Sequence, residues 1–323
     1  MSERSNPEPI LVTGTIAKDH LMNYDKRFLE DLREAITLDV LSISFEPFNY
    51  VQRHGGTGAN IAWNVAVLGG NPMLVANVGP DGMDYVKLLK ERGIDTKYVE
   101  VKQSANTATG ICCTDTKGHQ IWFFYRGADT VGHWPEIDKA DKPSYAIIGA
   151  RYHHQMIEGL EWCKERNVPS LFDPGQEILR FKPEELLHAT SISTGTIMNE
   201  FEWGMFKKRV NTSPEDILKH SSYLIITKGE GGYTIATRDG EASYPRCNCD
   251  NPINPTGAGD AFRAGLVQGL TSGWTLEQSS KLGAAISSFV VEQDGTLLPS
   301  LDRTLIQKRV KEAYGEELPD LPL

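Results

Sequence analysis

Short apolar runs that end in turn residues recur along this chain, and they constrain its fold more than any other feature. The clearest of them occupy residues 10–14, 73–79, 145–149, 170–174 and 223–229. Runs of this length suit strands that are buried on both faces. Helix-like stretches lie between them, at residues 59–68, 83–92, 156–165 and 261–270. This alternation predicts an α/β fold with a parallel sheet between two helix layers, in which ligands bind at the carboxyl ends of the strands.

Two segments break the alternation, residues about 36–54 and about 96–127. β-branched and aromatic residues alternate with other residues in the second segment, at residues 98–101, 110–114 and 120–125. The sequence Asp-Thr-Lys-Gly at residues 115–118 is a hairpin-type turn. We therefore expect a small accessory β-sheet, built from two excursions, that projects as a lid from one domain spanning residues 1–323.

Charge and cysteine content restrict the partners and the compartment. The chain of 323 residues carries 33 Lys and Arg against 43 Asp and Glu, a net charge of −10, which disfavours nucleic-acid binding. Its polar N-terminus lacks the apolar core of a secretory leader, and no apolar run approaches the roughly 18–20 residues of a membrane span. The odd number of cysteines, five, favours a reducing compartment. We expect a cytoplasmic protein that binds neither nucleic acid nor membrane.

The most informative stretch is a glycine-rich turn at residues 254–265 that runs directly into an apolar helix. The small residues Gly257, Ala258 and Gly259 let backbone N–H groups converge at the helix N-terminus, which forms an anion hole. Asp260 stands inside this hole, where a general base must lie to take a proton from a hydroxyl that attacks phosphorus. Alternatively, Asp260 only complements the helix dipole.

A second glycine-rich cluster, at residues 54–60, opens another helix. Gly55 and Gly56 allow close backbone approach to a polar ligand, and Asn60 offers both a donor and an acceptor to vicinal hydroxyls. A plain turn followed by a capped helix would have the same sequence features.

Together the two clusters resemble the signatures of the ribokinase-like (PfkB) family of carbohydrate and nucleoside kinases, and the resemblance spans nearly the whole chain. Two further elements follow in the family's order. Asn199 and Glu202 match its N-x-x-E element, and Thr227, Gly229 and Gly232 match its nucleotide-binding turn. The resemblance implies a three-layer α/β/α fold with a mostly parallel sheet and a β-sheet lid. It also implies that Asn199, Thr227, Gly229 and Gly232 bind ATP, and that Glu202 acts on Mg²⁺ indirectly.

Within the family, the chain looks most like bacterial adenosine kinases of the ribokinase-like type. This resemblance assigns the nucleoside to Thr15, Asp19, Phe124 and Gln176, together with Gly55, Gly56 and Asn60. Asp19 would hold sugar hydroxyls from the end of the first strand, and Phe124 would stack on the base. Trp122 shares its face with Phe124, so either ring could instead belong to lid core or a dimer interface.

Some positions depart from the adenosine kinase pattern. Glu177 stands where the pattern has a second glutamine, and Gly110 where it has a bulky aromatic residue. The turn begins Asn254-Pro255 rather than the commoner Asp-Thr, which leaves a requirement for K⁺ open. These departures also leave open which base the nucleoside carries.

The predicted activity is transfer of the γ-phosphoryl group of Mg-ATP to the 5′-hydroxyl of adenosine, giving AMP and ADP in purine salvage. Alternative acceptors are inosine, guanosine, cytidine, ribose or fructose. Arg126 and Arg263 are the candidates for contact with the transferred phosphate. The aromatic lid strand is compatible with a homodimer through the lid sheet or with a lid that only covers the site.

Other classes fit less well. The chain contains no Gly-Lys dipeptide, so a Walker-type phosphate loop is excluded, and Phe262 occupies the third glycine position of a dinucleotide fingerprint. The pairs Cys247/Cys249 and His153/His154 lack the partners that a metal site needs. A nucleoside-binding protein without turnover stays as an alternative from another class.

Overall fold

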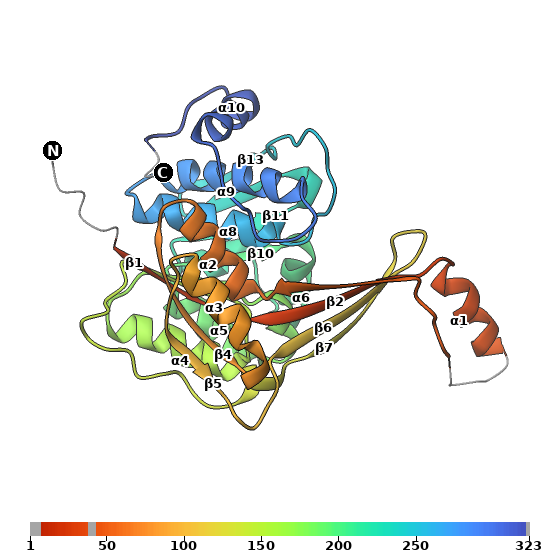
Figure 1. Ribbon diagram of the computed structural model, residues 1–323. Coiled ribbons are helices and arrows are strands. Elements are labelled where there is room, and N and C mark those ends of the chain that lie inside the picture. The colour runs from red at the N-terminus through yellow and green to blue at the C-terminus, as the bar shows by residue number, and fades with distance from the viewer. Residues whose placement is uncertain (1–7, 38–42, 321–323) are drawn as a thin grey trace.

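The apolar runs form strands of a nine-stranded sheet in the computed structural model, which describes residues 8–37 and 43–320 (Figure 1). The strand order is β13-β12-β11-β10-β9-β8-β1-β4-β5. All neighbours from β11 to β5 are parallel, whereas β12 and β13 are antiparallel additions at one edge. The strands are β1 (Pro9–Thr13), β4 (Asn71–Val78), β5 (Asp95–Val101), β8 (Tyr145–Ile148), β9 (Ser170–Phe172), β10 (Gly195–Asn199), β11 (Tyr223–Thr227), β12 (Tyr233–Thr237) and β13 (Gly240–Tyr244).

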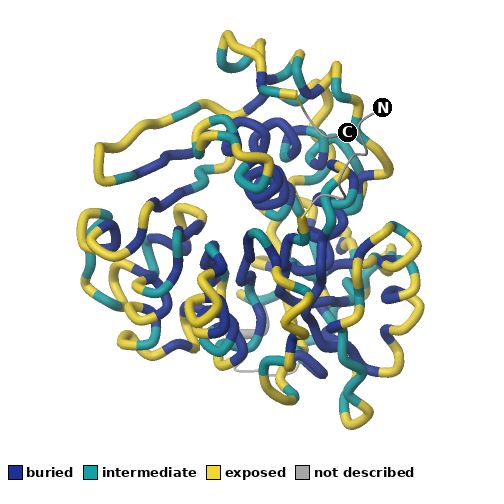
Figure 2. Tube along the Cα trace, turned by 90° about the vertical axis from the view of Figure 1, so that its left-hand side faces the viewer, coloured by how far each residue is buried: buried dark blue, intermediate teal, exposed yellow. Residues whose placement is uncertain are grey.

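Helices cover both faces of this sheet because successive strand residues point to opposite sides. In β1, Ile10 and Val12 pack into the core beneath one helix layer, and Leu11 packs into the core beneath the other. Figure 2 shows the buried residues concentrated along the strands and the inner sides of the helices. The first layer holds α2 (Thr57–Val67), α3 (Met83–Glu91), α8 (Ala258–Thr271), α9 (Leu276–Val291) and α10 (Arg303–Tyr314), and the second holds α4 (His153–Glu165), α5 (Pro183–Ile192), α6 (Glu200–Val210) and α7 (Pro214–Leu218). The predicted three-layer α/β/α architecture is confirmed.

A separate four-stranded sheet, which we call the lid sheet, extends from the large domain (Figure 1). Its order is β3-β2-β6-β7, and α1 (Phe28–Thr37) lies at its outer end. Its strands are β2 (Ala17–Asn23), β3 (Asn49–Gly55), β6 (Ala108–Thr114) and β7 (Gln120–Tyr125). Short 3₁₀ turns complete the chain at η1 (Pro80–Gly82), η2 (Gly127–Thr130), η3 (Gly175–Leu179) and η4 (Gly229–Gly231).

The lid sheet is therefore present, but its bounds differ from the predicted segments 36–54 and 96–127. β5 pairs with β4 as an edge strand of the large sheet, because an edge strand with one buried face alternates in the same way as a lid strand. β2 belongs to the lid sheet and lies outside both predicted segments. Residues 38–42 of the first segment lie outside the described residues.

Candidate active site

Two cavities meet where the loop before α8 turns into the helix. The first, of about 220 Å³, lies between the lid sheet and this loop, and the second, of about 360 Å³, lies between the loop and the β11–β12 turn. Asn254 lines both cavities. The N-terminus of α8 follows directly, with Thr256 on the first cavity and Ala258 and Gly259 on the second. A group bound at this helix end can therefore face both cavities.

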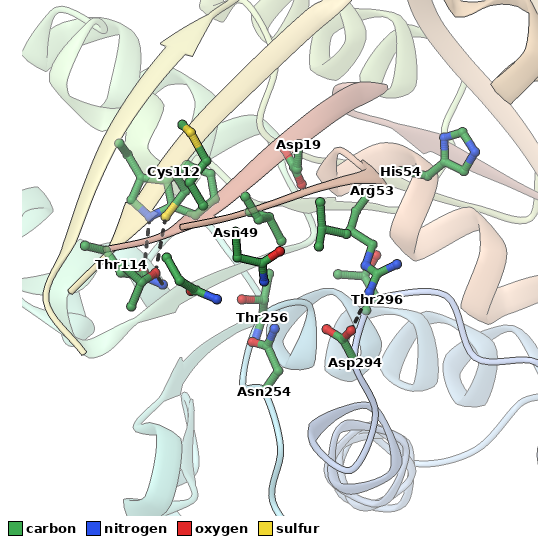
Figure 3. Close-up of a pocket in the computed structure, with 17 residues that line it drawn as sticks. Asp19, Asn49, Arg53, His54, Cys112, Thr114, Asn254, Thr256, Asp294 and Thr296 are labelled. Atoms are coloured by element: carbon green, nitrogen blue, oxygen red, sulfur yellow. Dashed lines mark hydrogen bonds and ion pairs between the residues drawn. The ribbon is translucent and has the colours of Figure 1, made fainter. Parts of the chain in front are cut away.

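The lid sheet turns one of its two faces to the first cavity. Strand register places Asp19 opposite Arg53 and Gly110, and Gly110 opposite Phe124, so these residues share that face. Figure 3 shows the labelled lid residues on one side of the cavity and Asn254, Thr256, Asp294 and Thr296 on the other. The first cavity is thus lined by side chains that come from distant parts of the sequence.

Backbone geometry at the start of α8 fits the predicted anion hole. Gly257 caps the helix in the left-handed region with φ 83°, and a Cβ at this position would lie 2.7 Å from Cγ2 of Thr296. Glycine is therefore required here by both backbone conformation and close approach. The N–H of Ala258 already donates to the carbonyl of Pro255 at 3.2 Å, so a hydrogen bond from it to an anion would be shared with that carbonyl. Gly257 and Gly259 lie at the helix terminus, where N–H groups have no helical acceptor.

Asp260 is held by a short chain of hydrogen bonds. Nδ2 of Asn60 donates to Oδ2 of Asp260 at 2.8 Å, and Oδ1 of Asn60 accepts from the Thr296 hydroxyl, also at 2.8 Å. Removal from water raises the pKa of Asp260 to about 7, against the lowering effects of Asn60 and Arg263 and with smaller raising contributions from Asp173 and Asp19. A carboxyl group that titrates near pH 7 suits a general base. Asn60, predicted to hold sugar hydroxyls, lines neither cavity, and its side-chain amide positions Asp260.

Asp19 extends from β2 of the lid sheet into the first cavity, and not from the end of the first strand as the resemblance implied. Burial raises its pKa to about 6. The missing side chains of two glycines make room for it, because a Cβ at Gly55 would collide with the carboxylate and one at Gly110 would lie 2.7 Å from Oδ1. Gly110 is thus explained by the space that Asp19 needs.

The other residues that are predicted to bind the nucleoside do not all line the first cavity. Gly56 adopts φ 96° beside the Thr15 carbonyl, which accepts the N–H of Gly58, so Thr15 and Gly56 form the turn next to the cavity and not its lining. Trp122 lines the first cavity. Phe124 lies on the same face of the lid sheet but does not line the cavity, and 46 % of its surface is exposed. Gln176 is exposed on η3 and contributes nothing to either lining.

Both arginines predicted to touch phosphate are bound to buried carboxylates. Arg263 forms a bidentate pair with Asp173, at 2.5 and 2.6 Å, and Arg126 pairs with Glu177. Burial raises the pKa of Glu177 against the opposing effect of Arg126. These ion pairs fasten α8 and the end of the lid sheet to the loops after β9, which are structural roles that the sequence did not indicate.

The second cavity contains most of the predicted ATP residues. Thr227, Gly229 and Gly232 line it, at the end of β11 and around η4. Asn199 does not line it but caps α6, and its Oδ1 accepts the N–H of Glu202 while Oε2 of Glu202 accepts the N–H of Asn199, both at 2.8 Å. Burial raises the pKa of Glu202, which lies near Arg263. Asn199 pairs with Thr227 in register, so this capped terminus adjoins the second cavity.

The first cavity is also lined by three residues that the sequence patterns do not single out, Arg53, Asp294 and Thr296. Arg53 directly precedes the 54–60 cluster, a signal that could have been used. Asp294 and Thr296 follow α9 in a loop without a distinctive pattern. Within the described ranges there is no group of three or more His, Cys, Asp and Glu residues that could hold a metal ion, and no helix long and apolar enough to cross a membrane.

Comparisons with known proteins find kinases of similar sequence and fold. A nucleoside kinase of Methanocaldococcus jannaschii is 30% identical over 304 residues, which cover 92% of this chain and 96% of that protein. The structure of a Burkholderia thailandensis nucleoside kinase in complex with inosine has a TM-score of 0.85 and 28% identity, covering 95% of this chain and 99% of that one. Its complex with ADP and inosine has a TM-score of 0.83 and 29% identity, over 97% and 98% of the two chains. Residues 30–303 match the profile of the pfkB family carbohydrate kinases, and the chain belongs to this family.

Proposed function

We propose that this protein is an ATP-dependent nucleoside kinase that phosphorylates the 5′-hydroxyl of adenosine, giving AMP and ADP. The observation that carries the proposal is the junction of two cavities at the N-terminus of α8, with Asp260 beside it. The nucleoside kinases of similar sequence and structure support the acceptor class. Phosphorylation of a preformed nucleoside would place the protein in purine salvage in the cytoplasm.

In this reaction each site residue has a defined task. Asp19 accepts hydrogen bonds from ribose hydroxyls, and the Gly55-Gly56 turn lets the sugar approach the backbone. Asp260 takes the 5′-hydroxyl proton as the oxygen attacks the γ-phosphorus, and the bond from that phosphorus to the β,γ-bridging oxygen breaks. The α8 N-terminus stabilises the charge on the transferred group, worth of order 3 kcal/mol for each well-placed donor. Thr227, Gly229 and Gly232 bind the donor nucleotide.

The residues near α6 fit the Mg²⁺ that the family implies. Magnesium keeps several waters and binds chiefly through substrate phosphates and one or two carboxylates, so it needs no cage of protein ligands. Glu202 is nearly buried, and only one of its oxygens is used in capping α6. Glu202 and Asn199 would hold the ion through water, and the ion would neutralise phosphate charge.

Inosine is the second candidate acceptor, and a glutamate at position 177 is compatible with it. This buried carboxylate stands at a glutamine position of the adenosine kinase pattern. It lines neither cavity, and its Oε1 pairs with Arg126 while its Oε2 lies 3.7 Å from Nε of Arg180. A carboxylate suits the N1–H donor of hypoxanthine, whereas adenine carries an acceptor at that position. The inosine complex of the Burkholderia thailandensis enzyme supports the same choice.

The test is ADP release from Mg-ATP with adenosine, inosine, guanosine, cytidine, ribose and fructose, with Asp260→Asn as the comparison. We expect a nucleoside to be far ahead of both sugars, and Asp260→Asn to lower kcat at least about 100-fold with nearly unchanged nucleoside affinity. Turnover of a free sugar alone would replace the acceptor. No turnover, together with tight nucleoside binding, would favour a binding protein.

A further inference from the structure

Arg53 is the one lysine or arginine among the described residues that line the first cavity. It lies on the cavity face of β3, directly opposite Asp19 in strand register. The only acidic side chains in the lining are Asp19 and Asp294. The cavity therefore brings a single fixed positive charge close to the proposed site of phosphoryl transfer.

The partner of Arg53 is unlike those of the other two arginines near the site. Nη2 of Arg53 pairs with Oδ2 of Asp294, whose side chain is 62 % exposed, whereas the carboxylates bound by Arg126 and Arg263 are each 2 % exposed. Leaving a buried carboxylate without its arginine is costly, but an exposed one is readily rehydrated. Nε of Arg53 is buried and has no hydrogen-bond partner in the described structure. Arg53 is therefore the arginine that can exchange its partner.

Contacts around Asp294 place the guanidinium at the phosphate end of the cavity. Thr296, two residues after Asp294, packs against Gly257 and donates to Asn60, which in turn holds Asp260. Figure 3 shows Arg53 pointing from the lid sheet towards Asp294, on the loop side of the cavity. Thr296 thus links the Asp294 loop to the α8 N-terminus, so an anion bound at that terminus would compete with Asp294 for Arg53, and it would carry more charge.

We propose that Arg53 is a catalytic residue that leaves Asp294 and binds the phosphoryl group during transfer, an inference that rests on the proposed function. The 5′-oxygen forms its bond to the γ-phosphorus as the bond to ADP breaks, and the hydroxyl proton passes to Asp260. Arg53 exchanges no proton or electron pair. It offsets negative charge on the equatorial oxygens, which otherwise meet only helix amides and the metal ion.

The experiment compares Arg53→Gln and Arg53→Lys with the wild-type protein, and uses Arg27→Gln as the matched control. Arg27 pairs with Glu30 on the exposed outer part of the lid, so its change removes the same charge far from the cavity. We expect Arg53→Gln to lower kcat roughly 100- to 1,000-fold, with the nucleoside Kd within about twofold of wild type. Added guanidinium ion should restore part of the turnover of an Arg53→Ala variant.

A role on the phosphoryl group also predicts the same fold-loss in kcat with every acceptor that the wild-type protein turns over. A loss that varies with the acceptor, a kcat within threefold of wild type, or a fall in nucleoside affinity and melting temperature without guanidinium rescue would each overturn the role of Arg53. If the wild type turns over only sugars, the proposed function fails. The role of Arg53 is then tested by the loss of kcat of its variants with those sugars as acceptors. A wild type inactive on every acceptor would overturn both.

Discussion

Asp260 and Asp19 both have raised pKa values, and under the proposed function they should control different parts of the pH profile. As the proposed base, Asp260 would act only when deprotonated, and its pKa of about 7 places its titration in the neutral range. We expect kcat to rise with pH between about 6 and 8 and then to level off. The residual turnover of Asp260→Asn should lack this rise, and a wild-type kcat that is flat over the interval would remove Asp260 from the role of base.

Asp19 should govern binding and not the chemical step. Its pKa of about 6 means that the carboxyl group is increasingly protonated as the pH falls, and it then accepts sugar hydroxyls less well. The nucleoside Kd should therefore increase below pH 6, while ADP binding stays constant. Calorimetric titrations at pH 5 and pH 8 would separate the two ligands, and equal nucleoside affinity at both values would contradict the assignment.

Gly55 has a measurable consequence because its missing side chain makes room for the Asp19 carboxylate. Gly55→Ala should reduce kcat/KM for the nucleoside at least about tenfold and leave ADP affinity unchanged. Gly204 on α6 has open space around the position of a Cβ and is the control, since alanine there should have no effect on activity. An active Gly55→Ala enzyme would show that Asp19 can move without loss.

At the scale of elements, Asp81 connects the base of the lid sheet to the large domain. Its Oδ2 accepts from Lys18 of β2 and its Oδ1 from the N–H of Thr107, each at 2.8 Å, so two strands entering the lid are tied to η1. The Thr107 hydroxyl donates to the same Oδ1 at 3.0 Å. The position of the lid over the first cavity depends on this tether.

Asp81→Ala should therefore loosen the lid without removing a residue of the reaction. We expect faster amide hydrogen exchange in β6 and a several-fold larger fraction of ATP hydrolysed without transfer, because a loose lid admits water. Asp84→Ala, which removes an exposed carboxylate three residues further on, is the control. Unchanged exchange and coupling in Asp81→Ala would show that the tether has no influence on closure.

At the scale of the whole molecule, the outer face of the lid sheet is apolar and exposed. Tyr50, Ile111, Phe123 and Tyr125 lie on this face, and each is at least 40 % exposed. An apolar patch of this kind marks an interaction surface, and we propose that two copies associate through it. Light scattering should find a dimer for the wild type and a monomer for Phe123→Lys, and a wild-type monomer at tens of micromolar would contradict the dimer.

The sequence predicted the fold and the centre of the site because both depend on local patterns. Asp260 and its glycines lie in one short stretch, and the apolar runs specify strands directly. Position within sheets was harder to predict. The sequence predicts β5 as a lid strand because an edge strand and a lid strand alternate alike. It does not predict β2, because the seven residues AKDHLMN contain no apolar run and only the first of them is buried.

The ion pairs that the arginines near the site form could not be predicted from the sequence. Arg53 meets Asp294 across 241 positions, and Arg263 meets Asp173 across 90, so no local pattern connects either pair. For the same reason the sequence predicts that Arg126 and Arg263 contact phosphate, whereas in the structure each of them binds a buried carboxylate. The chemistry of an arginine follows from its neighbours in space, and these depend on the complete fold.

Asn254 forms part of the wall of both cavities, and under the proposed function this shared wall has a consequence for the order of kinetic events. Donor and acceptor would occupy adjoining compartments on either side of one helix end, so the group crosses directly from one to the other. No carrier side chain has to store it between half-reactions. The kinetics should therefore be sequential through a ternary complex, with inversion at phosphorus and no exchange of label between ADP and ATP unless an acceptor is present.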